Sequence, residues 1–379
     1  MIGLLTAMAM LLNSSPRGIA LCVLLASLAL LYPTMVLTVW GAVYVPVTAV
    51  WTLPALSSPL ALLGAVIGYA LCGALFYGGA GFVVSRVLRR YPFLILGCSL
   101  GLAEAGSASF GLVMAPVGLF AVDGSLGYLV TLFSVVGTSI VIGVVASTIA
   151  RHLSLAFPTA VTVSLVLGQL TGPPPPKYNG PPIHGITHNP DPKLKWSSPE
   201  HAAENLAHLQ ALSDQVTGSG LIVWPEGAVT GTFDLEDAIA SLDPEHFPLL
   251  FGMTRYVSEG SRGLRNSAVL VTEDGVQFSD KMRLVPFYEG TVPFIHFSDL
   301  KPGLVRIVNL PDGTRILPLI CFEMFIPRPW FLLGIEADLI IVLSADAGLW
   351  GRIGSSVAMR HARARELETG VHVVRVSDR

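Results

Sequence analysis

The chain has 379 residues, a mean hydropathy of +0.64 and only 13% charged residues, which is too apolar for an ordinary soluble protein. Its net charge of −3 gives no reason to expect nucleic-acid binding. The first 170 residues carry only seven acidic or basic side chains, which are Arg17, Arg86, Arg89, Arg90, Glu104, Asp123 and Arg151. The sequence therefore predicts a helical transmembrane domain over residues 1–170 and a water-soluble domain after it.

The segments 60–83 and 126–150 are uncharged and long enough to cross a bilayer, which takes about 20 residues. We expect further spans at 18–31, 34–51, 92–113 and 153–170. The basic clusters at 86–90 and at Arg151 are two spans apart, so both can face the cytoplasm, as the positive-inside preference requires. This orientation predicts a multi-pass protein of the bacterial inner membrane whose residues 171–379 lie in the periplasm.

Two features of this half allow more than one interpretation. Glu104 lies within the predicted span 92–113, where a carboxylate costs about 2.5–3.5 kcal/mol, so we expect it to face protein or water. It is either a group at the membrane mouth of a substrate site or a packing carboxylate among small residues. The glycines of the segment 78–81 are more typical of helix packing than of a phosphate-binding loop.

Residues 171–182 form a proline-rich linker, because proline removes backbone donors and favours extended chain. We expect it to be a stiff spacer between the membrane and a domain over residues 183–379. In that domain Ser198 and Pro199 begin a helix over 199–216, and a second helix is expected at about 356–368. Strands are predicted at 183–188, 221–224, 249–253, 267–272, 305–310, 315–320, 339–343 and 371–376.

Three reactive side chains follow strands or strand pairs. Glu226 comes after the strand 221–224, Lys281 lies near the start of the segment 279–289, and Cys321 directly follows the strand 315–320. Cys321 is the only cysteine of the polar half, so it has no disulfide partner there. A carboxylate, an ammonium and a thiol together suit acyl transfer, as base, oxyanion donor and nucleophile. Each also has a structural alternative, as a capping carboxylate, a surface ammonium and a core thiol.

The ordered set of motifs resembles the nitrilase, or carbon-nitrogen hydrolase, superfamily. Its members carry a Glu-Lys-Cys triad in this chain order on an α/β fold, an αββα sandwich. The matching segments are Trp224-Pro225-Glu226, Lys281 with 284–287 and Glu289, Cys321-Phe322-Glu323, and Ser344-Ala345-Asp346. With the membrane half and the Leu-Val-Pro-Phe segment, the chain is most similar to apolipoprotein N-acyltransferases.

The resemblance implies a role for each matching residue. Cys321 would be the nucleophile, Glu226 the general base and acid, and Lys281 the oxyanion donor. Glu289 and Glu323 would line and orient the site, with Trp224, Ser344 and Asp346 as further supporting residues. The alternative for each of the two glutamates is a surface salt bridge. The implied reaction moves an acyl group from a phospholipid, through a cysteine thioester, to the amino terminus of a lipoprotein or to another amine. No metal or cofactor is implied.

Phe322 stands where the family has tyrosine, the segment 344–350 departs from the family pattern, and the family's chains continue beyond residue 379. These departures leave three other functions open. The chain also resembles conjugal-transfer proteins of the TraB type, which would imply an accessory role in plasmid transfer. A catalytically decayed membrane scaffold is a further alternative. A simple amidase is a poor alternative, because a soluble substrate gives no reason for several spans.

Overall fold

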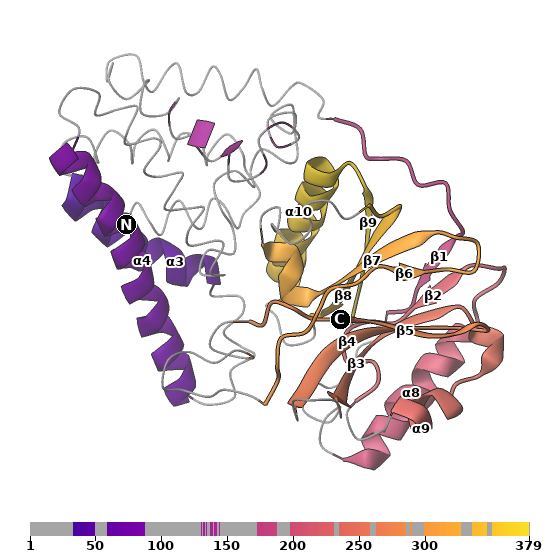
Figure 1. Cartoon of the computed structure of the whole chain (residues 1–379). Helices are drawn as coiled ribbons and strands as arrows, with labels where there is room; N and C mark the ends of the chain where they lie inside the picture. Colours follow the sequence, from indigo (N-terminus) through magenta and orange to yellow (C-terminus); the bar gives the residue numbers. More distant parts are fainter. Residues whose placement is uncertain are drawn as a thin grey trace. The chain divides into compact units, whose positions relative to one another are not determined.

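A computed structural model describes residues 33–49, 59–87, 173–187, 198–230, 235–257, 263–285, 289, 299–326, 336–346 and 351–378, with single positions between 130 and 144 (Figure 1). Its contacts divide the chain into two units. One comprises residues 1–175, 325–329 and 352–370, and the other comprises 176–324, 330–351 and 371–379. Glu104 and the predicted spans 18–31, 92–113 and 153–170 lie outside the described residues, and the span 126–150 is described only at single positions.

Two apolar helices of the first unit occur where spans are predicted at 34–51 and 60–83. They are α3 (Pro33–Ala49) and α4 (Pro59–Val87). By length and composition, one helix among the described residues can cross a bilayer, over Leu63–Val83, while the apolar part of α3, Thr34–Pro46, is shorter. Along α4, Leu63, Ile67, Leu71 and Leu75 recur every four residues and are each at least half exposed. This spacing places them on one face of the helix, as an apolar stripe.

Small residues allow α3 and α4 to approach closely. A methyl group on Gly41 would collide with the backbone carbonyl of Gly73, and one on Gly73 with that of Gly41. Near the end of the contact, a methyl group on Gly78 would lie 2.5 Å from Oγ1 of Thr38, whereas Gly79 faces open space. The packing role predicted for the glycines of 78–81 is thus confirmed at Gly78, as expected for helices that associate through small residues.

The second unit contains two sheets. The first has the strand order β1-β2-β3-β4-β5, with β1, β2 and β3 parallel and with antiparallel β3–β4 and β4–β5 pairs. Its strands are β1 (Ile183–Gly185), β2 (Leu221–Val223), β3 (Leu249–Val257), β4 (Gly263–Thr272) and β5 (Gly275–Asp280). The parallel pairing of β2 with its neighbours fits its continuous apolar sequence, because such strands are buried on both faces.

The second sheet has the order β6-β7-β8-β9. The short β6 (Val308–Asn309) pairs antiparallel with β7 (Arg315–Ile320) across the residues 310–314. β8 (Leu339–Ala345) and β9 (His372–Asp378) continue the sheet in parallel, and α10 (Gly351–Thr369) lies between these two strands in the chain. The two sheets share one buried core, to which β2, β3 and β4 contribute on one side and β6 to β9 on the other.

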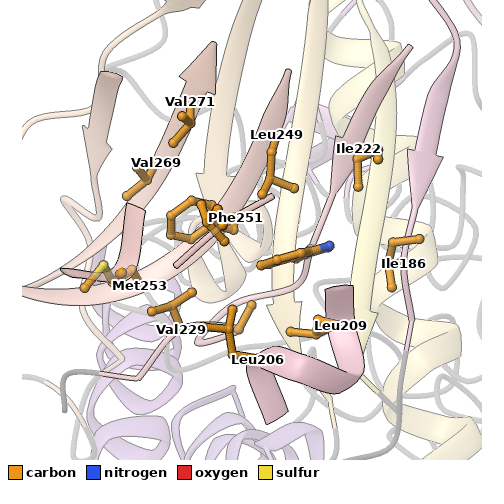
Figure 2. Close-up of a cluster of buried hydrophobic side chains, with 14 residues drawn as sticks. Ile186, Leu206, Leu209, Ile222, Val229, Leu249, Phe251, Met253, Val269 and Val271 are labelled. Atoms are coloured by element: carbon orange, nitrogen blue, oxygen red, sulfur yellow. The ribbon is translucent and has the colours of Figure 1, made fainter. Parts of the chain in front are cut away.

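Alternation along each strand builds a second core on the outer face of the first sheet. Leu221 and Val223 face the second sheet, whereas Ile222 and Trp224 face two helices, α8 (Pro199–Ser213) and α9 (Leu235–Ala240). Figure 2 shows this outer core, in which Phe251 and Leu249 of β3 belong to the same cluster as Leu206 and Leu209 of α8. Ser198 caps α8 as predicted, with its hydroxyl accepting from the backbone N–H of His201 at 3.4 Å.

The structure adds one strand to the prediction and shortens another. β5 is absent from the prediction, because its sequence is short and half polar, and it forms by pairing with β4 around a turn at Glu273 and Asp274. The strand predicted at 305–310 is reduced to β6. The residues before β6 instead form two backbone hydrogen bonds with the end of β5 and the residue after it. Asp280 N–H donates to the Leu304 carbonyl at 2.9 Å, and Gly303 N–H donates to the Lys281 carbonyl at 2.8 Å.

The proline-rich linker has no helix or strand over its described residues 173–182, as predicted. Its second half nevertheless packs on the sheets instead of standing free as a spacer. The ring of Tyr178 contacts the shared core and stacks on His372, with ring centroids 6.2 Å apart. The carbonyl of Pro182 accepts from Leu221 N–H at 2.9 Å. Aromatic contact and backbone pairing therefore attach this segment to the second unit.

Candidate active site

The structure brings together the side chains of Glu226 and Lys281, which are buried, and of Cys321, which is half-buried. Lys281 Nζ lies 3.3 Å from Glu226 Oε1, and both groups interact electrostatically with the Cys321 thiol. The three residues follow β2, β5 and β7, so the ends of strands from both sheets meet at this place. The lone cysteine predicted as a nucleophile thus has an acid and an ammonium beside it.

The carboxylate of Glu226 is held from three sides. Oε1 accepts from Asn266 Nδ2 at 2.7 Å as well as from Lys281, and Oε2 accepts from the backbone N–H of Ala345 at 3.1 Å. The turn that carries Glu226 lies tightly on β3, because a Cβ on Gly252 would be only 2.6 Å from Glu226 Cα. Only glycine leaves room for this approach. The position of the carboxylate therefore depends on strands β3, β4 and β8 together.

The ammonium of Lys281 is only 1% exposed and lies between two carboxylates. In addition to Glu226, it donates to Glu289 Oε1 at 2.8 Å. Burial by itself lowers the pKa of Lys281, but Glu226 and Glu289 outweigh it, so that the pKa lies well above its ordinary value. The lysine is therefore a fixed cation at neutral pH.

Cys321 begins the short helix η4 (Cys321–Phe325) directly after β7. It adopts φ = +47°, which is unusual for a residue with a side chain and makes a sharp strand-to-helix turn. Burial and the Glu226 carboxylate raise the pKa of the Cys321 thiol well above its ordinary value, and Lys281 opposes that rise. The resting side chain is therefore a thiol, which needs a base before it can attack.

Glu323, two residues after the cysteine, is fully buried and accepts from three backbone N–H groups of two chain segments. Oε1 accepts from Met282 N–H at 2.8 Å and Arg283 N–H at 3.3 Å, and Oε2 accepts from Ile320 N–H at 2.9 Å. It thereby ties the residues after Lys281 to the strand end before Cys321. Burial raises its pKa to about 7, while the N–H donors of Ile320 and Met282 and the Lys281 charge limit the rise.

Glu289 has a similar double role. While Oε1 pairs with Lys281, Oε2 accepts from Val285 N–H at 2.9 Å, so the carboxylate also bonds the backbone four residues before it. Both glutamates are buried beside the cluster, a position that does not fit the surface salt bridge considered as an alternative.

The three remaining predicted residues lie at different depths. Trp224 is fully buried in the outer core, where its ring N–H donates to Ser213 Oγ at 2.9 Å, so it can support Glu226 only through the backbone. Ser344 is buried in β8 next to Ala345, whose N–H holds Glu226. Asp346 lies near enough to Cys321 to raise the pKa of its thiol, and its carboxylate pairs with Arg375 of β9.

Two residues that the motifs do not include support this cluster. Asn266 contacts both Glu226 and Lys281, through its side chain and its carbonyl. Asp280, next to Lys281, accepts from Arg255 at 2.7 Å, Arg265 at 2.9 Å and Ser267 at 2.7 Å, which fixes the end of β5. A signal exists for Asn266, because asparagine is depleted in strands. This signal can be recognised only once residues 263–272 are known to form a strand.

One group of potential metal ligands occurs in the part of the chain that the structure describes. Asp214, Asp243 and His246 each offer one ligand atom within 4.8 Å of one another. The His246 ring already bonds the Asp214 carboxylate at 2.8 Å. These residues lie at the end of α8 and in η3 (Pro244–His246) and its cap.

Comparison with known proteins agrees with this geometry. The profile of the carbon-nitrogen hydrolase family matches residues 189–379, half of the chain. An apolipoprotein N-acyltransferase of Azotobacter vinelandii is 27% identical over 52% of this chain and 42% of its own length. One of Pseudomonas aeruginosa is 25% identical over 86% of this chain and 70% of its own length. The chain thus spans less than half of the Azotobacter relative.

Solved structures of the same family match more distantly. A carbon-nitrogen hydrolase from Helicobacter pylori is 15% identical, with a TM-score of 0.39 over 52% of this chain and 72% of that chain. The family profile, the two mixed sheets that share a core and the Glu-Lys-Cys cluster at their strand ends agree with one another. The chain belongs to the carbon-nitrogen hydrolase family and has its nitrilase-type α/β fold.

Proposed function

We propose that this protein is a membrane-bound N-acyltransferase that moves an acyl group from a phospholipid to a primary amine, such as the amino terminus of a lipoprotein. The observation that carries the proposal is the buried Lys281 ammonium, paired with Glu226 and lying beside the Cys321 thiol. The names of the relatives support the acyltransferase chemistry over a simple amidase.

The first half-reaction would acylate the cysteine. Glu226 accepts the thiol proton as Sγ attacks the ester carbonyl carbon, and the negative charge that develops on the carbonyl oxygen is stabilised by Lys281. The ester C–O bond then breaks, and Glu226 returns the proton to the departing alcohol. The raised pKa of the Cys321 thiol fits this order, because the attack then depends on the adjacent base.

A lipid donor requires a membrane setting for the chain. The exposed apolar stripe of α4 has the composition of a lipid-facing surface, and residues 1–170 carry few charges. We propose a multi-pass inner-membrane protein in which residues 1–170 span the bilayer, residues 171–182 connect, and residues 183–379 form the periplasmic catalytic domain.

Intact mass of the protein purified from membranes, with and without hydroxylamine, tests the chemistry. We expect an acyl adduct that hydroxylamine removes, because thioesters react with it. The adduct should disappear in Cys321→Ala and persist in Cys72→Ala, which removes another free cysteine, in α4. An unmodified wild-type Cys321 after incubation with phosphatidylethanolamine vesicles would contradict the proposal and favour the non-catalytic scaffold.

A further inference from the structure

Asn266 of β4 links the base and the cation of the cluster. Its side-chain Nδ2 donates to Glu226 Oε1 at 2.7 Å, the same oxygen that Lys281 Nζ approaches at 3.3 Å. Its backbone carbonyl accepts from Lys281 N–H at 2.8 Å. Displacement of Asn266 would therefore move Glu226 and Lys281 together.

The oxygen of the Asn266 side-chain amide is a buried acceptor without a donor in the described part of the chain. Asn266 is 6% exposed, and its Oδ1 has no hydrogen-bond partner among the residues that the structure describes. The amide cannot be turned round to remove this vacancy, because Oδ1 would then face the carboxylate oxygen of Glu226 and two acceptors would meet. A buried acceptor without a donor is costly, so a site that keeps one is expected to fill it when its ligand binds.

A primary amine fits this arrangement of acceptors. When the amine nitrogen attacks the thioester, one N–H must point to Glu226, which removes its proton. The amine then has a second N–H that needs an acceptor. Asn266 Oδ1 is an acceptor without a donor among the described residues, on the same side chain that bonds Glu226. The alcohol that leaves in the first half-reaction has only one O–H, which Glu226 alone can serve.

We propose that Asn266 Oδ1 binds the second N–H of the acceptor amine and so selects primary amines in the aminolysis step. This inference rests on the acyltransferase function proposed above. In the step, the amine nitrogen forms a C–N bond with the thioester carbon and the C–S bond breaks. Glu226 carries one amine proton to the Cys321 sulfur, so the products are an amide and the free thiol.

The experiment isolates acyl-enzyme from phosphatidylethanolamine vesicles and follows its deacylation by intact mass. The two acceptors are glycylglycinamide, a primary amine, and sarcosylglycinamide, which carries an N-methyl group and one N–H fewer. We expect Asn266→Ala to reduce the wild-type ratio of primary to secondary amine rates about ten-fold, the effect of one hydrogen bond. Formation of the acyl-enzyme should slow by a smaller factor than aminolysis by the primary amine.

Two further variants keep the result interpretable. Asn205→Ala removes a buried asparagine that bonds the Ala228 carbonyl at 2.8 Å, and it should leave the ratio unchanged even if it weakens the fold. If Asn266→Ala does not fold, Asn266→Ser replaces it. The serine hydroxyl has one proton, which can be donated only to Glu226, and the shorter side chain reaches the amine less well. The ratio of primary to secondary amine rates should therefore fall again.

The outcomes separate the two proposals. An acyl-enzyme that forms normally but loses primary and secondary amine rates equally in the Asn266 variant overturns the role of Asn266 and leaves the acyltransferase function standing. A wild-type enzyme that forms no hydroxylamine-sensitive adduct overturns the acyltransferase function, and the inference with it.

Discussion

Lys281 is the residue on which the charge balance of the cluster depends. Its ammonium is buried against Glu226 and Glu289, and the Cys321 thiol lies beside all three. Two carboxylates at such depth are tolerable only with the cation between them. The same cation is the group proposed to stabilise the oxyanion, so its structural and chemical roles cannot be separated by stability alone.

Replacing Lys281 by Met should therefore affect both properties. We expect a fall of about 10²–10³ in the rate of Cys321 acylation, because an oxyanion donor is lost. We also expect a lower apparent thermal midpoint, because a broken buried pair costs about 3–5 kcal/mol. Lys301→Met, at a half-buried lysine outside the cluster, is the matched control and should change neither value. A Lys281→Met protein with wild-type acylation rate would refute the assigned role.

Glu323 predicts a dependence of stability on pH. Its pKa is about 7 in the folded protein, against about 4.3 for an ordinary glutamate, so the folded state holds the proton more tightly. The stability contribution of this group is therefore fully present below about pH 4 and declines as pH rises to about 7. The difference in apparent thermal midpoint between wild type and Glu323→Gln should shrink over this range.

The control for this titration is Glu336→Gln, because Glu336 is 81% exposed in a surface pair with Arg315. The difference in apparent thermal midpoint between wild type and Glu336→Gln should vary little between pH 4.5 and 7.5. A constant difference for Glu323→Gln as well would show that this carboxyl does not titrate in that range.

At the scale of elements, the close contact of α3 and α4 depends on glycine. The helices lie so near at Gly41 and Gly73 that neither position accepts a methyl group without movement of the backbone. In the proposed membrane setting the helices gain little from the hydrophobic effect, so close packing of this kind would supply much of their association.

Gly41→Ala should separate the two helices, whereas Gly79→Ala, which adds its methyl group to open space on α4, should be neutral or slightly stabilising. A cysteine pair at Thr34 and Ser85, whose hydroxyl oxygens are 3.3 Å apart, reports the packing through disulfide formation. We expect the disulfide yield to fall several-fold in the Gly41→Ala background and to stay unchanged in the Gly79→Ala background. Equal yields in both would contradict the predicted contact.

At the scale of the whole molecule, the proposed topology assigns opposite sides of the membrane to two parts of the chain. The basic cluster at 86–90 should face the cytoplasm, and the connecting segment around Lys177 should face the periplasm. Lys177 is exposed, so a label can reach it.

Single cysteines in a chain whose four native cysteines are replaced by alanine test this assignment. A membrane-impermeant maleimide applied to intact spheroplasts should label Lys177→Cys and should label Arg89→Cys only after the cells are lysed. The reverse pattern would place the catalytic unit in the cytoplasm and would overturn the proposed access to a periplasmic acceptor.

The sequence by itself determined the division into an apolar and a polar half, the apolar strands, and the order of Glu226, Lys281 and Cys321. These features are local, since composition, periodicity and a strand end can be read within a few residues. β5 and the true extent of β6 required the tertiary structure, because these short strands are specified by their neighbours. The separation of Trp224 from the cluster likewise follows from which face of β2 meets the helices. Asn266 could be recognised only in three dimensions, because its importance lies in bonds to residues 40 positions before it and 15 after it in the chain.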